Sequence, residues 1–400
     1  MVTLLAGETQ CRPATRLIDL ARGQFSGVRG QGLQLVDLAN AYRLDDQLAQ
    51  SLSWARWAVL DQVWGQEPID PRAWHVLAHV LLDLGRYHEA AGMYQRADPE
   101  GIHGRLQHNR ARALLGEGAW AEAWALAEQR WTVDEIVAAG PPRPHWLGWP
   151  EVSSLTLWDE QGFGDTLQAL RWIPEVYQAS MPLTLEVRAP LQRLLQQGLR
   201  WLGPNLNVRV RDECPIVSGC HGSLLSLPAL LKAQCWPDPA VLRLPKPLQS
   251  TGGPRIGLVW EAGRYLDDPS KALEYRRKTI PSDQLEQLCA AILQRKVDLV
   301  LLQPGYDIPD KADFLEQAQA VQRCDLLLSV DTAAAHLGGA IGHPTWLLLP
   351  WAAASRWQRH RDDTELYPGM RLVRQPRHGD WPGLVQQVLI ALDHWLLMGC

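Results

Sequence analysis

Three short stretches of this 400-residue sequence combine glycine, charged and hydroxyl residues in patterns suited to holding an anionic ligand. The first, residues 159–165, reads Asp-Glu-Gln-Gly-Phe-Gly-Asp. It follows an apolar strand pattern and precedes a helical one, so Gln161, Gly162 and Gly164 would let the backbone turn tightly and approach a ligand. Asp165 would lie at the start of that helix and face a ligand cleft. An aspartate at this position is equally a good cap or first-turn residue, and that alternative stays open.

The second stretch, residues 329–336, reads Ser-Val-Asp-Thr-Ala-Ala-Ala-His. We expect a buried strand to end at Val330 and a helix of small residues to begin at Thr332. The free N–H groups and the dipole of such a helix start form an anion site. Asp331 could bind a ribose or order the loop, and His336 would lie one turn into the helix on the side of Thr332. The alternative is a capping aspartate and a core histidine.

The third stretch, Arg276-Arg-Lys278, lies after an apolar strand and a long polar segment. Three consecutive cations can neutralise a diphosphate. On a loop, where we expect them, such residues are also typical of solvated surface.

Two series of short apolar strands alternating with helices must position these stretches. Strands that alternate with helices predict parallel sheets, and parallel sheets bind ligands at the carboxyl ends of their strands. We therefore expect two Rossmann-like domains, 151–247 and 255–376, around a central cleft, which is the glycosyltransferase-B (GT-B) architecture. A C-terminal helix, 377–400, follows. The expected strands are 155–158, 183–187, 208–210, 256–260, 297–302, 326–330 and 346–349.

The part before these domains has a helical pattern with a repeat. After an N-terminal segment, 1–34, small residues recur 33 positions apart within residues 35–139, which is typical of tetratricopeptide repeats. The recurring pairs are Ala78 and Ala111, Gly85 and Gly118, and Ala90 and Ala123. An irregular helical bundle is the alternative. Residues 140–150, rich in proline and glycine, predict a domain boundary.

Composition narrows the class of protein. The net charge of −5 argues against a nucleic-acid partner, and the seven dispersed cysteines indicate reduced thiols in a cytoplasmic protein. The first ten residues lack the features of a signal peptide, and the apolar runs are too short for a transmembrane segment. A peripheral position at the inner membrane face stays open.

Taken together, the three stretches resemble glycosyltransferase family 9, the relatives of the lipopolysaccharide heptosyltransferases. Residues 155–174 resemble its N-terminal signature, with a close match at residues 161–168, Arg171 and Pro174. Residues 256–281, 299–303 and 325–350 resemble its nucleotide-binding half, with a close match at residues 329–336. His221 with residues 224–228 also matches. Preceded by helical repeats, the chain is similar to bacterial repeat-containing glycosyltransferases and, distantly, to O-linked N-acetylglucosamine transferase.

The resemblance implies roles for the matching residues. Asp165 matches the proposed general base, and His221 is the second catalytic candidate. Lys278 matches the phosphate-binding lysine, while Thr332 and His336 match the donor-diphosphate helix, next to Asp331. Gln303 lies where the family contacts the nucleotide. One departure is Glu261, where the family begins a Ser/Ala-Gly-Asn segment.

These features predict a metal-independent, inverting glycosyltransferase without a cofactor, whose donor is a nucleoside-diphosphate sugar. The sequence contains no Asp-x-Asp, the motif that commonly holds a metal–diphosphate pair. The acceptor is a glycan, a lipid-linked glycan or a protein, and the repeats could bind a protein partner. The departure at Glu261 leaves an inactive binding or scaffold protein as the alternative. A dinucleotide-dependent oxidoreductase fits less well, since Leu167 stands where its fingerprint needs a third glycine.

Overall fold

The structure is a computed structural model, and the chain divides into two compact units that are each built from several segments. The first unit draws on Met1–Asp134, Arg264–Arg277 and Ala352–His360, and the second on the remaining segments. The structure describes residues 32–65, 70–133, 146, 148, 152–178, 180–211, 219–238, 241–245, 247, 252–264 and 267–398. Most of the expected boundary at 140–150 and nearly all of the segment 1–34 lie outside these residues.

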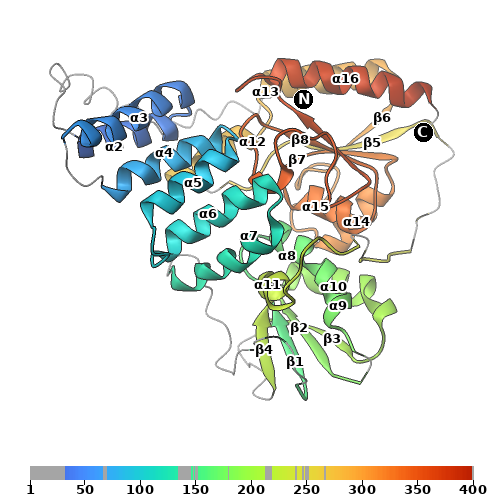
Figure 1. The fold of residues 1–400 in the computed structure, drawn as a ribbon. Helices are drawn as coiled ribbons and strands as arrows, with labels where there is room; N and C mark the ends of the chain where they lie inside the picture. Colours follow the sequence, from blue (N-terminus) through green and yellow to red (C-terminus); the bar gives the residue numbers. More distant parts are fainter. Residues whose placement is uncertain are drawn as a thin grey trace. The chain divides into compact units, whose positions relative to one another are not determined.

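The first unit consists of helices in which chain neighbours pack against one another (Figure 1). Local signals set their ends. Asp70 caps α4 by accepting a hydrogen bond from the Arg72 N–H at 2.8 Å, and Pro71 fills its first turn. Gly118 ends α6 in the left-handed conformation, with φ 78°. The helices are α2 (Gly32–Leu44), α3 (Leu48–Gly65), α4 (Pro71–Asp83), α5 (Tyr87–Ala97), α6 (Gly104–Glu117), α7 (Trp120–Ala127), η1 (Glu128–Thr132), η5 (Ser355–Trp357) and most of α12 (Pro269–Lys278).

Small residues make the close packing of this unit possible. Ala78, Ala90 and Ala123 are fully buried, and these are positions of the 33-residue period. At Gly85, where φ is +68°, an added Cβ would lie 2.3 Å from the Arg359 side chain. That the helices are tetratricopeptide repeats stays a prediction.

The second unit contains two parallel sheets. The first is a four-stranded sheet in the order β3-β2-β1-β4, and its β1 pairs with both β2 and β4. Its strands are β1 (Leu155–Trp158), β2 (Leu183–Val187), β3 (Leu206–Val210) and β4 (Cys220–Ser223). The accompanying helices are α8 (Phe163–Ala169), η2 (Leu170–Trp172), α9 (Ile173–Val176), α10 (Ala189–Gly198), η3 (Arg200–Leu202), η4 (Leu224–Ser226) and α11 (Leu227–Leu230).

The second sheet is five-stranded, in the order β6-β5-β7-β8-β9. Alternate residues of β7 enter different cores: Leu326 and Leu328 pack with α13 and α16, whereas Leu327 packs towards α14 and α15. Helices therefore cover both faces of the sheet. Its elements are β5 (Arg255–Val259), α13 (Ser282–Gln294), β6 (Asp298–Leu301), α14 (Phe314–Gln322), β7 (Leu326–Val330), α15 (Ala333–Ala340), β8 (Thr345–Leu349), β9 (Met370–Arg374) and α16 (Trp381–Leu397).

The prediction of two parallel sheets is confirmed, and two strands were missed. Strand β4 reads Cys-His-Gly-Ser, and β9 reads Met-Arg-Leu-Val-Arg, so neither shows a continuous apolar run. Both are edge strands, where one side of the backbone lacks a neighbouring strand and polar residues are tolerated. Among the described helices, none combines the length and apolarity needed to cross a membrane.

Candidate functional site

The carboxyl end of the second sheet carries the residues of the second stretch. Asp331 follows β7 directly, Thr332 is the N-cap residue of α15, and His336 lies in that helix. Within the described structure, the Thr332 side chain makes no capping hydrogen bond to the first turn of α15. The first N–H groups of this helix are therefore not covered by a cap side chain, as an anion site requires.

Lys278 reaches this helix start from α12. Its ammonium Nζ lies 3.2 Å from Oδ2 of Asp331, which in turn precedes the N-cap residue Thr332. The Asp331 carboxylate also lies 4.0 Å from Nε2 of His336. One cation is thus held next to the start of α15 by a carboxylate that is only 7% exposed.

The expectation that three cations act together on a loop was wrong. Residues 276–278 form the end of helix α12, whose side chains point in different directions. Arg277 forms ion pairs with Asp46 at 2.6 Å and Asp83 at 3.1 Å, and Arg276 donates to the Leu44 carbonyl at 2.8 Å. The two arginines therefore contact residues of the first unit, whereas Lys278 contacts Asp331.

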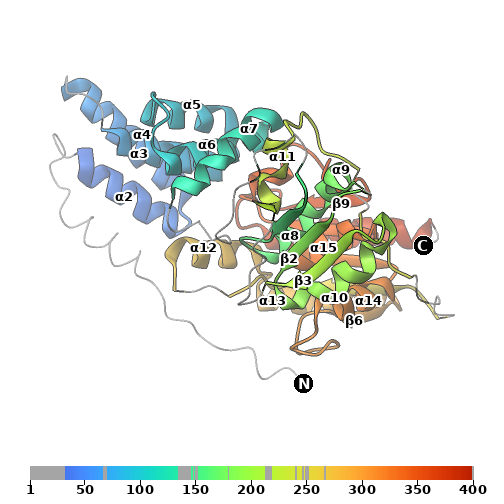
Figure 2. The ribbon, with the colours of Figure 1, turned by 90° about the horizontal axis from the view of Figure 1, so that it is seen from below.

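The glycine-rich stretch of the first sheet meets α15. A Cβ added at Gly164 would lie 2.7 Å from Cδ2 of His336, which is too close for any side chain. Helices α8 and α15 pack side by side in both views (Figures 1 and 2). Two residues that are 172 positions apart in the sequence (336 − 164) are thereby brought into contact, and glycine at 164 permits that approach.

His336 is fixed by a second contact that the sequence did not reveal. Its Nδ1 shares a hydrogen bond with the Tyr367 hydroxyl at 3.0 Å, and both side chains are buried. The Arg171 guanidinium lies 5.7 Å from the ring centre of Tyr367, and burial lowers the pKa of Arg171 to about 10. The hydrogen bond of Nδ1 to Tyr367 supports the alternative of a core histidine. The other ring nitrogen, Nε2, lies on the side of Asp331.

Asp165 is partly exposed in the first turn of α8. Its Oδ2 accepts a hydrogen bond from the Gly162 N–H at 3.1 Å, which is the backward half of a capping box. The capping alternative is thus realised in the structure. It does not remove the carboxylate from solvent, so a role as a base stays a prediction.

Arg188, which the sequence did not single out, holds this loop together. Its Nε lies 2.6 Å from Oδ2 of the fully buried Asp159. Its two terminal nitrogens donate to the Gln161 carbonyl at 2.8 Å and to the Thr166 hydroxyl at 3.2 Å. The guanidinium also lies 4.1 Å from the ring centre of Phe163. One arginine after β2 therefore bridges the residues before and after the glycines.

The loop has a strained backbone at Gln161, whose φ is +58°. A non-glycine residue in the left-handed region is unfavourable and persists only when its surroundings enforce it. The Arg188 bond to the Gln161 carbonyl is one such constraint.

Gln303 lies just beyond β6, at the same edge of the sheet as Asp331. Its Oε1 is buried and accepts no hydrogen bond within the described structure. Tyr306, three residues on, is half exposed and packs edge-on against Trp260 at 4.9 Å between ring centres. A lone tyrosine in a loop carries no sequence signal, so Tyr306 was missed.

His221 lies inside β4 and is 1% exposed. Its Nδ1 accepts a hydrogen bond from the Trp158 indole at 2.9 Å, which leaves Nε2 as the protonated nitrogen of a neutral ring. This contact and the pairing of β4 with β1 place His221 within the first sheet.

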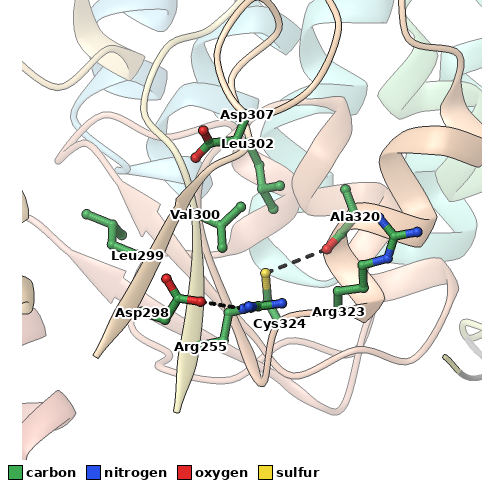
Figure 3. A pocket seen from close by; sticks show the side chains of 9 residues that line it. All are labelled: Arg255, Asp298, Leu299, Val300, Leu302, Asp307, Ala320, Arg323 and Cys324. Carbon is green, nitrogen blue, oxygen red and sulfur yellow. Dashed lines mark hydrogen bonds and ion pairs between the residues drawn. The ribbon is translucent and has the colours of Figure 1, made fainter. Parts of the chain in front are cut away.

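A pocket of about 430 Å³ lies elsewhere, along β6 and the end of α14 (Figure 3). Arg255 and Asp298, paired at 2.7 Å, stand at the starts of their strands, and Cys324 at the base donates to the Ala320 carbonyl. Burial raises the pKa of the Cys324 thiol to about 12, so the thiol is unreactive at neutral pH. The pocket shares no lining residue with the predicted site.

Comparisons with known proteins give these findings. No family model matches the chain. Protein FlbA of Caulobacter vibrioides is 26% identical over 377 residues, which are 80% of this chain, and the chain spans 61% of that protein's length. Among solved structures, the Escherichia coli ADP-heptose lipopolysaccharide heptosyltransferase II has a TM-score of 0.37 at 12% identity, covering 61% of this chain and 99% of its own. A Thermobaculum terrenum O-GlcNAc transferase mutant has a TM-score of 0.29 at 12% identity, covering 96% and 88%.

Proposed function

We propose that this chain is a glycosyltransferase that moves a sugar from a nucleoside-diphosphate donor to an acceptor hydroxyl. The observation that carries the proposal is the meeting of the glycine-rich loop with α15: Gly164 lies against His336, and Lys278 is paired beside the same helix start. Residues whose types suit a base and a diphosphate site are thereby gathered from two parallel sheets.

In the proposed reaction, the Asp165 carboxylate takes the proton of the acceptor hydroxyl while the hydroxyl oxygen attacks the anomeric carbon of the donor sugar. The bond from that carbon to the diphosphate breaks, and the nucleoside diphosphate leaves with the bonding electrons. Lys278 and the N–H groups at the start of α15 stabilise the growing negative charge. Direct displacement with a single base inverts the anomeric centre, and Lys278 supplies the positive charge that a metal ion supplies in other glycosyltransferases.

The nucleoside would bind at the neighbouring strand end. The Gln303 Oε1 is a buried acceptor with no donor among the described residues, so it suits the N–H or O–H of a base or ribose. The half-exposed Tyr306 offers an aromatic face for a base. Asp331 would exchange part of its contact with Lys278 for one with the ligand.

We further propose that the helices of the first unit are tetratricopeptide-like repeats that bind a protein partner. The supporting observation is the burial of the small residues at 33-residue spacing. The acceptor is then a glycan, a lipid-linked glycan or the protein partner itself.

The test is a screen of purified full-length chain against a panel of nucleoside-diphosphate sugars, with released nucleoside diphosphate and transferred sugar measured by mass spectrometry. Lys278→Met is the matched variant, and we expect it to bind and turn over the active donor more weakly. Absence of turnover with every donor, together with unchanged donor binding by Lys278→Met, would reject the proposal.

An inactive binding protein is the second candidate. Three observations favour it: Glu261 replaces the family's usual residue, the Asp331 carboxylate already pairs with Lys278, and Asp165 caps α8. Donor binding without transfer or hydrolysis, across the same panel, would select this candidate.

A further inference from the structure

The edge strand β6 is the least covered strand of the second sheet. All four of its residues keep part of their surface exposed, whereas every residue of β7 is buried. The pocket of about 430 Å³ described above lies beside it, between β6 and the end of α14 (Figure 3). Its floor is apolar: Val300 and Ala320 are partly buried, and Leu302 and Cys324 are buried. We call this pocket the β6 groove.

Alternate residues of β6 turn their backbone groups away from the sheet. The N–H groups of Asp298 and Leu302 donate to carbonyls on the side of β5, at 2.9 Å each. In a parallel ladder only alternate residues bind the neighbouring strand. The N–H and carbonyl groups of Leu299 and Leu301 therefore point outward, to the free edge of the sheet.

The outward groups of these two residues are in different states. The loop after β6 covers Leu301, whose N–H donates to Oδ2 of Asp307 at 2.7 Å and whose carbonyl accepts from the Asp307 N–H at 3.1 Å. The N–H and carbonyl of Leu299 have no partner among the described residues. One donor and one acceptor, both from a single residue, are thus open at this edge. The backbone of an extended peptide supplies the complementary pair.

The β6 groove also carries a positive charge without an acid partner. Arg255 is paired with Asp298 at 2.7 Å. Arg323, exposed at the end of α14, lines the groove and forms no ion pair in the part of the chain that the structure describes. Figure 3 shows the other acid, Asp307, beside Leu302 and away from Arg323. A ligand with a negative group near Arg323 therefore complements the groove.

We propose that the β6 groove binds an extended segment of a partner polypeptide, which adds to the edge of the sheet at Leu299. A partner residue paired with Leu299 has its side chain on the same face as Leu299, which packs towards α13 and α16. Its two chain neighbours then point to the opposite face, where the groove lies. One neighbour, apolar, covers Val300 and Ala320, and the other, acidic, meets the Arg323 guanidinium.

A peptide fits better than a small carboxylate, which would meet Arg323 but leave the N–H and carbonyl of Leu299 without partners. The inference does not depend on transferase activity, since the groove shares no lining residue with the proposed donor and base site.

The test measures binding of a fluorescently labelled heptapeptide to the full-length protein by anisotropy. The peptide consists of threonines with one leucine and one glutamate two positions apart, in both orders, because the segment can run parallel or antiparallel to β6. We expect one order to bind and to slow hydrogen exchange in the segment around Leu299. Replacing the glutamate by glutamine, or methylating the backbone nitrogen of the threonine between the two, should weaken binding about three- to tenfold.

Two variants test the two kinds of contact. Leu299→Pro removes the outward N–H and breaks no hydrogen bond to β5, and proline is tolerated at an edge in this orientation. It should weaken binding about three- to tenfold, and more than its matched control Leu299→Ala, which keeps the N–H. Arg323→Gln should weaken binding of the glutamate peptide about three- to fivefold and leave the glutamine peptide unaffected.

Arg377→Gln is the matched control for charge, because Arg377 is 85% exposed, pairs with Asp380 and does not line the groove. Its affinity for the glutamate peptide should equal that of the parent. Urea unfolding of each variant checks the fold. If Leu299→Pro does not fold, the methylated peptide and Arg323→Gln still decide the outcome.

The proposal is overturned if neither peptide order binds, if the glutamine peptide binds equally well, or if Arg377→Gln weakens binding as much as Arg323→Gln. Equal losses for Leu299→Pro and Leu299→Ala, with no effect of peptide methylation, would reject addition to the sheet edge. Displacement of the peptide by acetate at a similar concentration would assign the groove to small acids instead. A dimer in sedimentation that Leu299→Pro dissolves, without peptide binding, would assign the edge to a second copy of the chain.

Discussion

Replacing Arg188 by methionine should destabilise the second unit and loosen the glycine-rich loop. The change keeps an apolar stem but removes the guanidinium from Asp159, from the Gln161 carbonyl and from Thr166. Asp159 is fully buried, and its Oδ1 accepts no hydrogen bond among the described residues. Only the backbone N–H of residue 188, at 3.3 Å, would remain for its charge.

The magnitude follows from burial. Removing one partner of a fully buried ion pair costs about 3–5 kcal/mol, but the Arg188 side chain is 34% exposed and water can enter its place. We therefore expect a loss of about 2–3 kcal/mol, or about 4–12 °C in melting temperature for a unit of this size. Arg188→Lys should lose less, because it keeps the charge without the forked donors.

The assay combines urea unfolding of the full-length variants with hydrogen exchange of the segment around Gly162, followed by mass spectrometry. Arg193→Met is the matched control, since Arg193 is 57% exposed and pairs with Asp313 at the surface, a pair worth less than about 1 kcal/mol. Adding Asp159→Asn to Arg188→Met should recover part of the loss, because the unpaired buried charge is removed. Equal losses for the Arg188 and Arg193 variants, or strict additivity with Asp159→Asn, would refute the reasoning.

Three further predictions concern the site and the first unit. Asp165→Asn keeps an oxygen that can accept from the Gly162 N–H, so the free energy of unfolding should change by less than about 1 kcal/mol. Single-turnover sugar transfer should fall roughly 10²–10⁴-fold, because the base is lost. Transfer at the parental rate would show that Asp165 is only a helix cap. Lys278→Met should weaken donor binding in calorimetry by about 1.5–3 kcal/mol, and unchanged affinity would remove Lys278 from the site. Because burial lowers the pKa of folded His75 from 6.5 to about 4, protons bind the unfolded chain first, and stability should decline as pH falls from 6.5 towards 4, by up to about 3 kcal/mol. His75→Gln should flatten that decline in urea titrations, and an unchanged slope would show that His75 is not its source.

The strands that the sequence predicted well are those with continuous apolar runs. Leu326–Val330 is buried at every position between two layers of helices, and such a strand is apolar along its whole length. Strand β4 has no such pattern, and its place is set by pairing with β1. The start of α15 could also be predicted from local sequence, because a run of small residues follows a buried strand.

Long-range partners limited what could be predicted of the site. The acceptors of Arg188 lie 22 to 29 positions earlier in the chain, so nothing in the spacing around Arg188 points to them. The wrong prediction for the three cations at residues 276–278 has the same cause. Their composition is that of a phosphate site, but Arg277 has partners 231 and 194 positions away, in helices that no local pattern connects to it.

The segmented construction of the first unit limits how the chain can be cut or recombined. Asp83 relies on Arg277, and the close approach at Gly85 relies on Arg359, so two later segments complete what the first 134 residues begin. A fragment that stops there would lose the Arg277 contacts of Asp46 and Asp83 and the Arg359 side chain next to Gly85. Exchange of the N-terminal helices between homologues should therefore succeed only when α12 and residues 352–360 are transferred with them, and the helical unit is not a detachable module.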